Sequence, residues 1–281
     1  MWIALPVLDE IVDRTLREDL GAGDLTSEAT VPEGKIAVGT AVARGPLVVC
    51  GGVVFQRVFA RLDPAVTFEA LVPDGASVVK GAAIWRVRGP ARALLMGERS
   101  ALNLVQRMSG TATAARAYVA RLPPGSTTRV TDTRKTTPGL RVLERYAVRC
   151  GGAHNHRDSL GTAVMIKDNH IVAAGGIEAA VARARERAPH LSRIEVEVAS
   201  LSELELALRA RADVIMLDNF DLDALGEAVR RVNGRALLEA SGGITLETLA
   251  AYAKTGVDVV SVGALTHSAK AADIALDLAL A

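Results

Sequence analysis

The sequence predicts an α/β fold in which a small α+β module precedes a series of βα units around a parallel sheet. From Arg129 onward, short apolar segments rich in β-branched residues alternate with helix-forming segments, at an interval that shortens to roughly twenty residues and is typical of βα units. Aromatic residues make up only 3% of the 281 residues, whereas 49% are hydrophobic and 25 are glycine. This composition favours helices packed closely on a buried sheet.

The first part of the chain is predicted to combine helices with short strands. Apolar residues from Leu8 to Leu16 repeat at helical spacing and indicate a helix that ends near Gly21. Residues 21–26 are rich in glycine, but no strand precedes them and they lack the dinucleotide-binding fingerprint, so we expect a turn and a helix cap there. The next segments favour a strand at residues 36–49, a helix at 51–62 and strands at 66–72, 77–79 and 84–87.

Six further strands are predicted in the second half of the chain. A long helix is expected after Pro90, because proline is common at helix starts, and Gly110 is expected to interrupt it. The candidate strands are residues 130–133, 163–166, 194–198, 214–217, 236–240 and 257–262. Helices with apolar faces are expected at residues 177–187, 201–208, 222–232 and 246–253. Six strands are fewer than the eight of a closed βα barrel, so the pattern leaves closure open.

Charge and composition argue against several classes of protein. The net charge is +1 and aromatic residues are few, which disfavours a nucleic-acid partner held by bulk charge or base stacking. The apolar start at residues 2–8 lacks a basic leader and meets Asp9 and Glu10 at once, so we expect neither a signal peptide nor a membrane span. Cys50 and Cys150 have no metal-site spacing and form no disulfide framework, which fits a reducing cytoplasm.

The stretch from Arg129 to His170 concentrates residues that suit chemistry. It holds three of the five histidines, and each of its two predicted strands ends in a charged cluster. The first cluster is RKTTPG at residues 134–139, and the second is KDNH at residues 167–170. An ordinary connection does not need these side chains, so we expect them to face an anion; solvated loop charges are the alternative.

Charged residues or glycines gather at the same end of almost every predicted strand. In strand order they are Arg134 and Lys135, Lys167 and Asp168, Glu197, Asp218 and Asn219, Glu239 to Gly243, and Gly263. The carboxyl ends of the strands in a βα barrel meet at one rim, where active sites of this class are built. The series therefore predicts one shared site, with coincidental helix caps as the alternative.

The residue types suggest what this site binds. Arg134, Lys135, Arg157 and Lys167 suit carboxylates or phosphates. Glu197 and Asp218 either neutralise these cations or hold a Mg²⁺ ion that carries a diphosphate. Small residues with approachable backbone N–H groups could seat a phosphate or simply form tight turns, namely Ser241, Gly242, Gly243 and Gly263.

Two histidines lie near Arg157, and we do not expect them to form a zinc site. His154 and His156 are two residues apart, a spacing that metals sometimes use, but the loop offers no third ligand and disfavours zinc. We expect His156, next to Arg157, to donate a hydrogen bond to an anionic substrate.

At these residues the sequence closely resembles the quinolinate phosphoribosyltransferase family. The matching fragments are REDLGAGDLTSEAT, GERSALNLVQRMSG, TRKTTPGLRVLERYAV, NHR, IKDNHI, EVEV, IMLDN, EASGGI and SVGALTHS. They cover almost the whole chain in the family's order. The resemblance implies an N-terminal α+β open sandwich and an incomplete TIM-like β/α barrel. The implied domains are residues 1–113 and 114–267, with the tail at 268–281 packed on the first.

The resemblance also implies a reaction. Quinolinate and phosphoribosyl pyrophosphate would give nicotinate mononucleotide, pyrophosphate and carbon dioxide, with Mg²⁺ as the cofactor, in cytoplasmic NAD synthesis. The active site of the family lies at the interface of a homodimer or higher homo-oligomer. Neither nucleic acid nor membrane is an implied partner.

Individual roles follow from the same resemblance. Arg134, Lys135, His156, Arg157 and Lys167 would line the quinolinate pocket, with Arg99 reaching in from a neighbouring subunit. Glu197 and Asp218 would face the ribose and its metal-bound pyrophosphate, and Ser241, Gly242, Gly263 and His267 would hold the 5-phosphate. The catalytic residues would be Lys135, Lys167, Glu197 and Asp218.

One loop departs from the family, and three rival functions stay open. Many members read NHRxGLxD, whereas this chain has Ser159 for the glycine and Thr162 for the aspartate, which puts the loop conformation in question. A related group associated with molybdenum transport shares TRKT but typically lacks the KDNH segment that is present here. The second rival is a phosphosugar isomerase or aldolase with Lys167 as a Schiff-base amine, and the third is a ligand-binding regulator without turnover.

Overall fold

A computed structural model describes residues 3–281, so the first two residues of the chain, which include the start of the predicted apolar segment, lie outside it. The chain forms two compact units. We call residues 3–116, 136–152 and 265–281 the antiparallel unit, and residues 117–135 and 153–264 the parallel unit. Among the helices of residues 3–281, none is both long enough and apolar enough to cross a membrane.

The parallel unit is built on a six-stranded parallel sheet with the order β6-β11-β10-β9-β8-β7. Its strands are β6 Arg129–Thr131, β7 Val164–Ile166, β8 Ile194–Val198, β9 Val214–Asp218, β10 Leu237–Ser241 and β11 Val259–Ser261. All six predicted strands are confirmed, although several are shorter than the apolar runs that indicated them. Because β6 and β7 are the two ends of the strand order, the sheet is an incomplete barrel.

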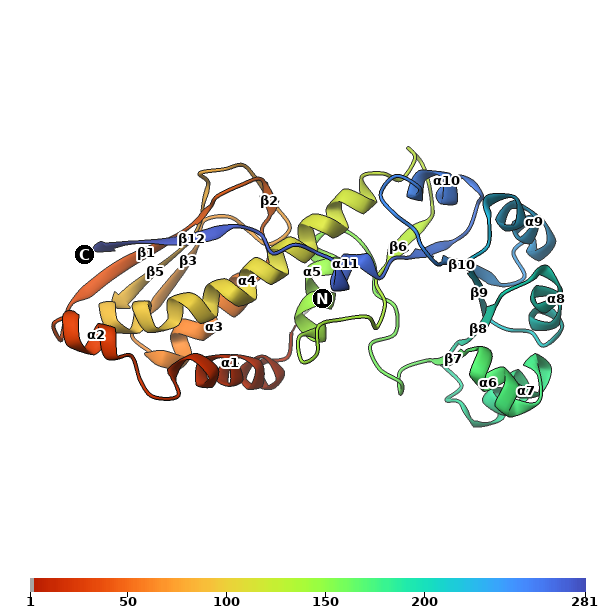
Figure 1. Cartoon of the computed structure of the whole chain (residues 1–281), viewed down its shortest axis with the longest axis horizontal. Helices are drawn as coiled ribbons and strands as arrows, with labels where there is room; N and C mark the ends of the chain where they lie inside the picture. Colours follow the sequence, from red (N-terminus) through yellow and green to blue (C-terminus); the bar gives the residue numbers. More distant parts are fainter. Residues whose placement is uncertain (1–2) are drawn as a thin grey trace. The chain divides into compact units, whose positions relative to one another are not determined.

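Helices connect the strands of this sheet and lie outside it (Figure 1). They are α6 Asp168–Ala174, α7 Ile177–Arg187, α8 Leu201–Arg209, α9 Leu222–Val232 and α10 Leu249–Lys254. Side-chain caps fix where two of them begin: Ser200 accepts from the Glu203 amide at the start of α8, and Asp221 accepts from the Ala224 amide at the start of α9.

The antiparallel unit contains a four-stranded sheet with the order β12-β1-β5-β3. Its strands are β1 Ile36–Ala43, β3 Thr67–Ala70, β5 Ala83–Pro90 and β12 Ile274–Leu280, and a separate pair joins β2 Leu47–Val48 to β4 Ser77–Val78. The C-terminal strand β12 pairs antiparallel with β1 from Ala37↔Leu280 to Ala43↔Ile274. The tail thereby completes a sheet whose first strand lies near the other end of the chain.

The helices of this unit are α1 Leu5–Leu20, α2 Leu25–Thr30, α3 Gly52–Leu62, α4 Ala91–Val119, α5 Arg141–Cys150 and α11 Ala264–His267, of which α4 and α11 extend into the parallel unit. The mostly aliphatic core of the unit contains an aromatic cluster. Phe55 on α3 lies 5.1 Å from Trp85 on β5 and 5.0 Å from Phe59, ring centre to ring centre. All three are fully buried, and burial of each such side chain contributes about 2–3 kcal/mol.

Two local features differ from the sequence-based expectation. The predicted turn at residues 21–26 is confirmed, but it also starts a short helix, α2, because the Asp24 side chain accepts from the Ser27 amide. Gly110 does not interrupt α4, which runs continuously from Ala91 to Val119. A β-carbon at Gly110 would lie 2.0 Å from the Lys270 carbonyl oxygen, so this glycine permits close backbone contact.

Candidate active site

Four acids and a serine lie on one face of the parallel sheet, and the serine and three of the acids lie between the middle and the carboxyl end of their strands. Glu197 on β8 and Glu239 on β10 both pair with Met216 of β9, which lies between them. Asp218 is two residues beyond Met216 and pairs with Ser241. Since paired residues and residues two apart share a face, Glu195 lies on the same face as Glu197. The register therefore gathers the polar series that the sequence indicated.

Lys167 contributes a cation to this face. Its Nζ forms an ion pair with Glu197 Oε2, although its side chain is still 42% exposed. Its backbone N–H donates to His170 Nδ1 at 3.0 Å, at the start of α6. Part of the KDNH cluster is thus a helix cap, while the lysine side chain points to the acids.

His156 lies between two buried glutamates. Its Nε2 is 3.0 Å from Glu195 Oε2 and 3.6 Å from Glu239 Oε2. The buried Asp132, just after β6, holds the histidine loop, because it accepts from the His156 amide and from the Asn155 side chain, each at 2.7 Å. The loop is therefore anchored to the end of β6.

The pKa values of Glu239 and of His156 are both raised in this cluster. Burial, and then the negative charge of Glu195, raise the pKa of Glu239 to about 7. Burial alone would lower the pKa of His156, but its hydrogen bond to Glu195 and the charge of Glu239 outweigh burial and raise it. The histidine is therefore held in its charged form to a higher pH than an exposed one.

Arg157 and Arg134 form a positive region next to this cluster. Burial, followed by repulsion from Arg134, lowers the pKa of Arg157, which shows that the two guanidinium groups act on each other. An arginine stays charged even so. The Nε of Arg157 is buried and has no hydrogen-bond partner within residues 3–281, while an outer nitrogen donates to the Ala163 carbonyl at 3.1 Å.

The loop that departs from the family is closed by the two departing residues themselves. The Thr162 hydroxyl donates to the Ser159 carbonyl at 3.3 Å. A hollow of about 480 Å³ lies beside this loop, and Arg157, His170 and Arg183 are among the residues that line it. A hydrogen bond between Thr162 and Ser159 therefore closes a turn in this loop.

The two glycines after β10 adopt left-handed backbone conformations. Gly242 and Gly243 have φ angles of +103° and +59°. A β-carbon on Gly242 would lie 2.2 Å from Asn219 Oδ1, and the Asn219 amide donates to the Ser241 carbonyl at 2.9 Å. The loops after β9 and β10 are thus locked together, and only glycine fits at residue 242.

The predicted site residues divide between the two units. Ten lie in the parallel unit: Arg134, Lys135, His156, Arg157, Lys167, Glu197, Asp218, Ser241, Gly242 and Gly263. Arg99 on α4 and His267 at the end of α11 belong to the antiparallel unit. Arg99 is exposed, and His267 Nδ1 lies 2.6 Å from the Ser268 hydroxyl.

Sequence reasoning did not select Asp132 or Glu195. A signal for Glu195 exists, because acids two apart in the buried strand IEVEV must share a face with Glu197. Asp132 gave no such signal, since an aspartate at a strand end is common in ordinary turns.

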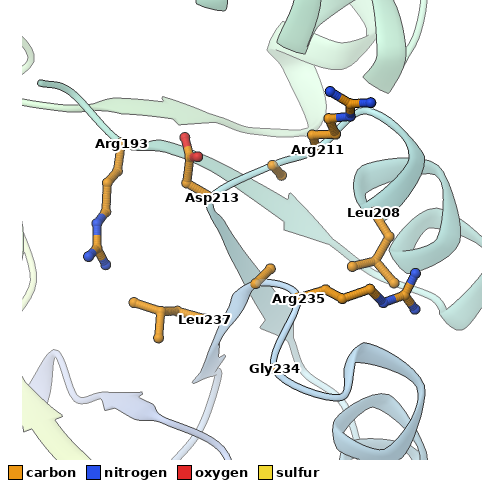
Figure 2. Close-up of a pocket in the computed structure, with 9 residues that line it drawn as sticks. Arg193, Leu208, Arg211, Asp213, Gly234, Arg235 and Leu237 are labelled. Atoms are coloured by element: carbon orange, nitrogen blue, oxygen red, sulfur yellow. The ribbon is translucent and has the colours of Figure 1, made fainter. Parts of the chain in front are cut away.

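A different and larger hollow lies at the opposite end of the same strands. It measures about 570 Å³ and is lined by Arg193, Arg211, Asp213 and Arg235 among others (Figure 2). These residues precede β8, β9 and β10, whereas the acids lie towards the carboxyl ends. The three guanidinium groups point in different directions in Figure 2. We therefore place the candidate site at the acids and not at this hollow.

Comparisons with known proteins show which family this chain resembles over its length. Residues 24–109 and 111–277 match the N-terminal and C-terminal domain models of quinolinate phosphoribosyl transferase. The chain is 44% identical to a probable nicotinate-nucleotide pyrophosphorylase (carboxylating) of Bacillus subtilis, over 97% of this chain and 94% of that protein. The human nicotinate-nucleotide pyrophosphorylase (carboxylating) is 42% identical to the chain, over 96% of this chain and 91% of that protein. The crystal structure of NadC from Streptococcus pyogenes superposes with a TM-score of 0.96 at 40% identity, covering 100% of this chain and 99% of that one.

Proposed function

Because this chain belongs to the quinolinate phosphoribosyltransferase family, we propose that it joins quinolinate to phosphoribosyl pyrophosphate in NAD synthesis. The products are nicotinate mononucleotide, pyrophosphate and carbon dioxide. The observation that carries the proposal is the match of both family domains over residues 24–109 and 111–277. The cations and acids at the carboxyl ends of β6 to β10 provide the chemistry that two highly anionic substrates require.

The carboxylates of quinolinate are assigned to Arg134, Lys135, His156, Arg157 and Lys167. The buried Nε of Arg157, which has no acceptor within residues 3–281, supports this assignment because a substrate carboxylate would supply one. The same carboxylate would relieve the repulsion between Arg157 and Arg134. His156 adds a further cation, kept charged by Glu195 and Glu239.

Glu197 and Asp218 are assigned to a Mg²⁺ ion that accompanies the pyrophosphate. They are carboxylates on one face of the neighbouring strands β8 and β9, and Mg²⁺ is usually held by one or two carboxylates together with substrate phosphates. When bound, the ion would neutralise charge on the departing pyrophosphate. Lys167, paired with Glu197, holds its ammonium group next to the same place.

The 5-phosphate of the ribose is assigned to Ser241, Gly242, Gly263 and His267. Left-handed glycine backbone after a parallel strand supports this role, because its N–H groups can turn towards a phosphate.

We also expect a homodimer or larger assembly in which Arg99 of one subunit reaches the quinolinate of another. The cytoplasmic location stays a prediction.

Catalysis in this proposal is mainly electrostatic. The pyridine nitrogen attacks the anomeric carbon of the ribose, and the bond to pyrophosphate breaks with its electron pair on the leaving oxygen. The ribosylated nitrogen is then positively charged and accepts the electrons of the adjacent C–C bond as carbon dioxide leaves. A proton takes the vacated position on the ring. The ammonium groups of Lys135 and Lys167 are assigned to stabilise the negative charge that develops.

A product assay tests the proposal and separates it from the rival functions. The purified chain is incubated with quinolinate, phosphoribosyl pyrophosphate and Mg²⁺, and nicotinate mononucleotide and pyrophosphate are measured. We expect both products in equal amounts, and only when both substrates are present. Quinolinate binding without pyrophosphate release would instead favour a ligand-binding regulator. Covalent trapping of Lys167 by borohydride with a carbonyl substrate would favour a Schiff-base enzyme.

A further inference from the structure

The two cysteines, which the sequence left without a role, come together in the antiparallel unit. Cys50 and Cys150 are far apart in sequence, yet their sulfur atoms and a carboxylate oxygen of Asp74 all lie within 4.8 Å of one another. Cys50 lies two residues before α3 and is buried, and Cys150 is the last residue of α5 and is partly exposed. The pair therefore joins one buried cysteine to one partly exposed cysteine.

Asp74 has a structural role in this cluster. It accepts hydrogen bonds from the Gly51 amide at 2.9 Å, the Gly52 amide at 3.1 Å and the Tyr146 hydroxyl at 2.9 Å. Gly51 and Gly52 start α3, so the carboxylate caps that helix. Most of its acceptor positions are thus occupied. Because the Asp74 carboxylate already accepts these three hydrogen bonds, the two thiols are the reactive groups of the cluster, and a closed metal site is disfavoured.

The backbones that carry the thiols are both fixed to α4. The Ser109 hydroxyl contacts the Cys50 amide and the Cys50 carbonyl, each at 3.1 Å. Arg116 donates to the Cys150 carbonyl at 3.3 Å and to the Gly151 carbonyl at 2.9 Å. Residues 109 and 116 are about two helical turns apart on one face of α4. The two cysteines are therefore held close together before any reaction, so forming a bond between their sulfur atoms would cost little additional conformational entropy.

The surroundings give the two thiols unequal reactivity. Burial raises the pKa of Cys50 well above its ordinary value, which keeps this thiol protonated. A hydrogen bond from Cys50 lowers the pKa of Cys150, and its partial exposure lets an oxidant approach. Cys150 is thus suited to react first and Cys50 to react second.

We propose that Cys50 and Cys150 form a reversible disulfide when the protein meets a peroxide. The Cys150 thiolate attacks one peroxide oxygen, the O–O bond breaks, and Cys150 becomes a sulfenic acid as hydroxide leaves and takes up a proton. Cys50 sulfur then attacks the Cys150 sulfur, and the hydroxyl leaves with the Cys50 proton as water. In total two thiols and one hydrogen peroxide give one disulfide and two waters. A dithiol reductant reverses the reaction by exchange.

The test is stoichiometric oxidation of the full chain, followed by thiol counting and mass spectrometry. With one equivalent of hydrogen peroxide, we expect both thiols to disappear together, the mass to fall by two hydrogen atoms, and the tryptic peptides of Cys50 and Cys150 to be linked. Dithiothreitol restores both thiols. Because the disulfide closes a loop of about a hundred residues, the oxidised protein should unfold at a temperature higher by roughly 5 °C than the reduced one.

Two single variants check the assigned order. In Cys50→Ala, peroxide should leave a sulfenic acid on Cys150 that a dimedone probe traps, whereas in Cys150→Ser the buried Cys50 should stay reduced. If Cys50→Ala does not fold, the disulfide is still tested by Cys150→Ser and by the search for linked Cys50 and Cys150 peptides in the unaltered chain. Three results would overturn the proposal: thiols that stay reduced, links only between molecules, or one tightly bound zinc ion per chain that protects both sulfurs. None of these readouts depends on the proposed reaction.

Discussion

His156 is the residue whose charge depends most on its neighbours. It is close to two carboxylates, Glu195 and Glu239, that are themselves buried at one face of a parallel sheet. Two buried acids of like charge do not both ionise readily, and a histidine between them is favoured as a cation. Glu239 therefore keeps its proton, and His156 its positive charge, to a higher pH than exposed groups of the same types, because the pKa of each is raised.

The raised pKa of Glu239 predicts how stability changes with pH. In the folded state the pKa of this carboxyl is about 7, whereas its ordinary value is 4.5. The folded protein therefore binds this proton more tightly than the unfolded chain does. Its contribution is fully present below the lower value and is lost as the pH rises through the higher one, and the raised pKa of His156 acts in the same direction. The free energy of unfolding should fall by on the order of 2–3 kcal/mol between about pH 5 and about pH 8.

Denaturant unfolding of Glu239→Gln at several pH values checks this prediction. The amide cannot ionise, so most of the decline between about pH 5 and about pH 8 should disappear. Glu247→Gln is a matched control, because the Glu247 hydrogen bond to Thr245 lowers its pKa and takes its titration below this range. Equal slopes in the unaltered chain and in Glu239→Gln would show that the acid cluster does not hold the extra proton.

Lys167 should contribute to turnover and not to folding. Its ammonium group pairs with Glu197 and is partly exposed, so its removal leaves the core intact. We expect Lys167→Ala to lower kcat/KM by about 10- to 100-fold, the usual cost of one charge-assisted hydrogen bond. Steady-state kinetics beside the exposed Lys254→Ala control, which should be unchanged, measure this effect. An unimpaired Lys167→Ala enzyme would remove the lysine from the assigned set.

The charged residues near strand ends could be identified from the sequence, but contacts between residues far apart in the sequence could not. Lys167 and Glu197 stood out because charged residues or glycines recur at the same end of successive predicted strands, and Arg157 stood out because it lies beside His156 in the NHR fragment. The proximity of Cys50 to Cys150 left no sequence signal, since α4 brings them together through Ser109 and Arg116.

At the scale of elements, the strands were the most predictable part. β9, Val214–Asp218, reads as an apolar run that ends in an acid, and β8, Ile194–Val198, reads as β-branched residues that alternate with glutamate. The short helix α2 was missed, because its six residues carry no apolar period and depend on the Asp24 cap. Gly110 was misread, because the reason for a glycine there is Lys270, which lies far along the chain.

The close contact at Gly110 predicts a destabilised variant. In Gly110→Ala the new methyl group meets the Lys270 carbonyl oxygen at 2.0 Å, so α4 and the segment that leads to β12 must separate. We expect a loss of about 1–3 kcal/mol in the free energy of unfolding, although alanine is the better helix former.

Gly226→Ala in α9 is the matched control for that substitution. A β-carbon there would meet only the Arg230 side chain, at an ordinary 3.5 Å. This variant should therefore gain about 0.5–1 kcal/mol. Thermal and denaturant unfolding of both variants compare them directly. A stabilised Gly110→Ala would contradict the close approach.

At the scale of the whole molecule, the parallel sheet separates two ends with different character. Its carboxyl ends carry Glu197, Asp218 and Glu239, while the residues before its strands include Arg193 and Arg235 around a larger hollow. The alternation of strands and helices predicted the sheet, and the rule that parallel strands present their carboxyl ends together is the reason for assigning the site to that end.

The most direct test of this account is quinolinate binding by calorimetry to two arginine variants at opposite ends of the sheet. Arg157→Ala removes a cation assigned to the substrate carboxylates, and Arg193→Ala removes one from the hollow before β8. We predict that Arg157→Ala weakens binding at least about tenfold, whereas Arg193→Ala leaves it unchanged. Equal weakening by the two variants, or weakening by Arg193→Ala alone, would contradict a site at the carboxyl ends.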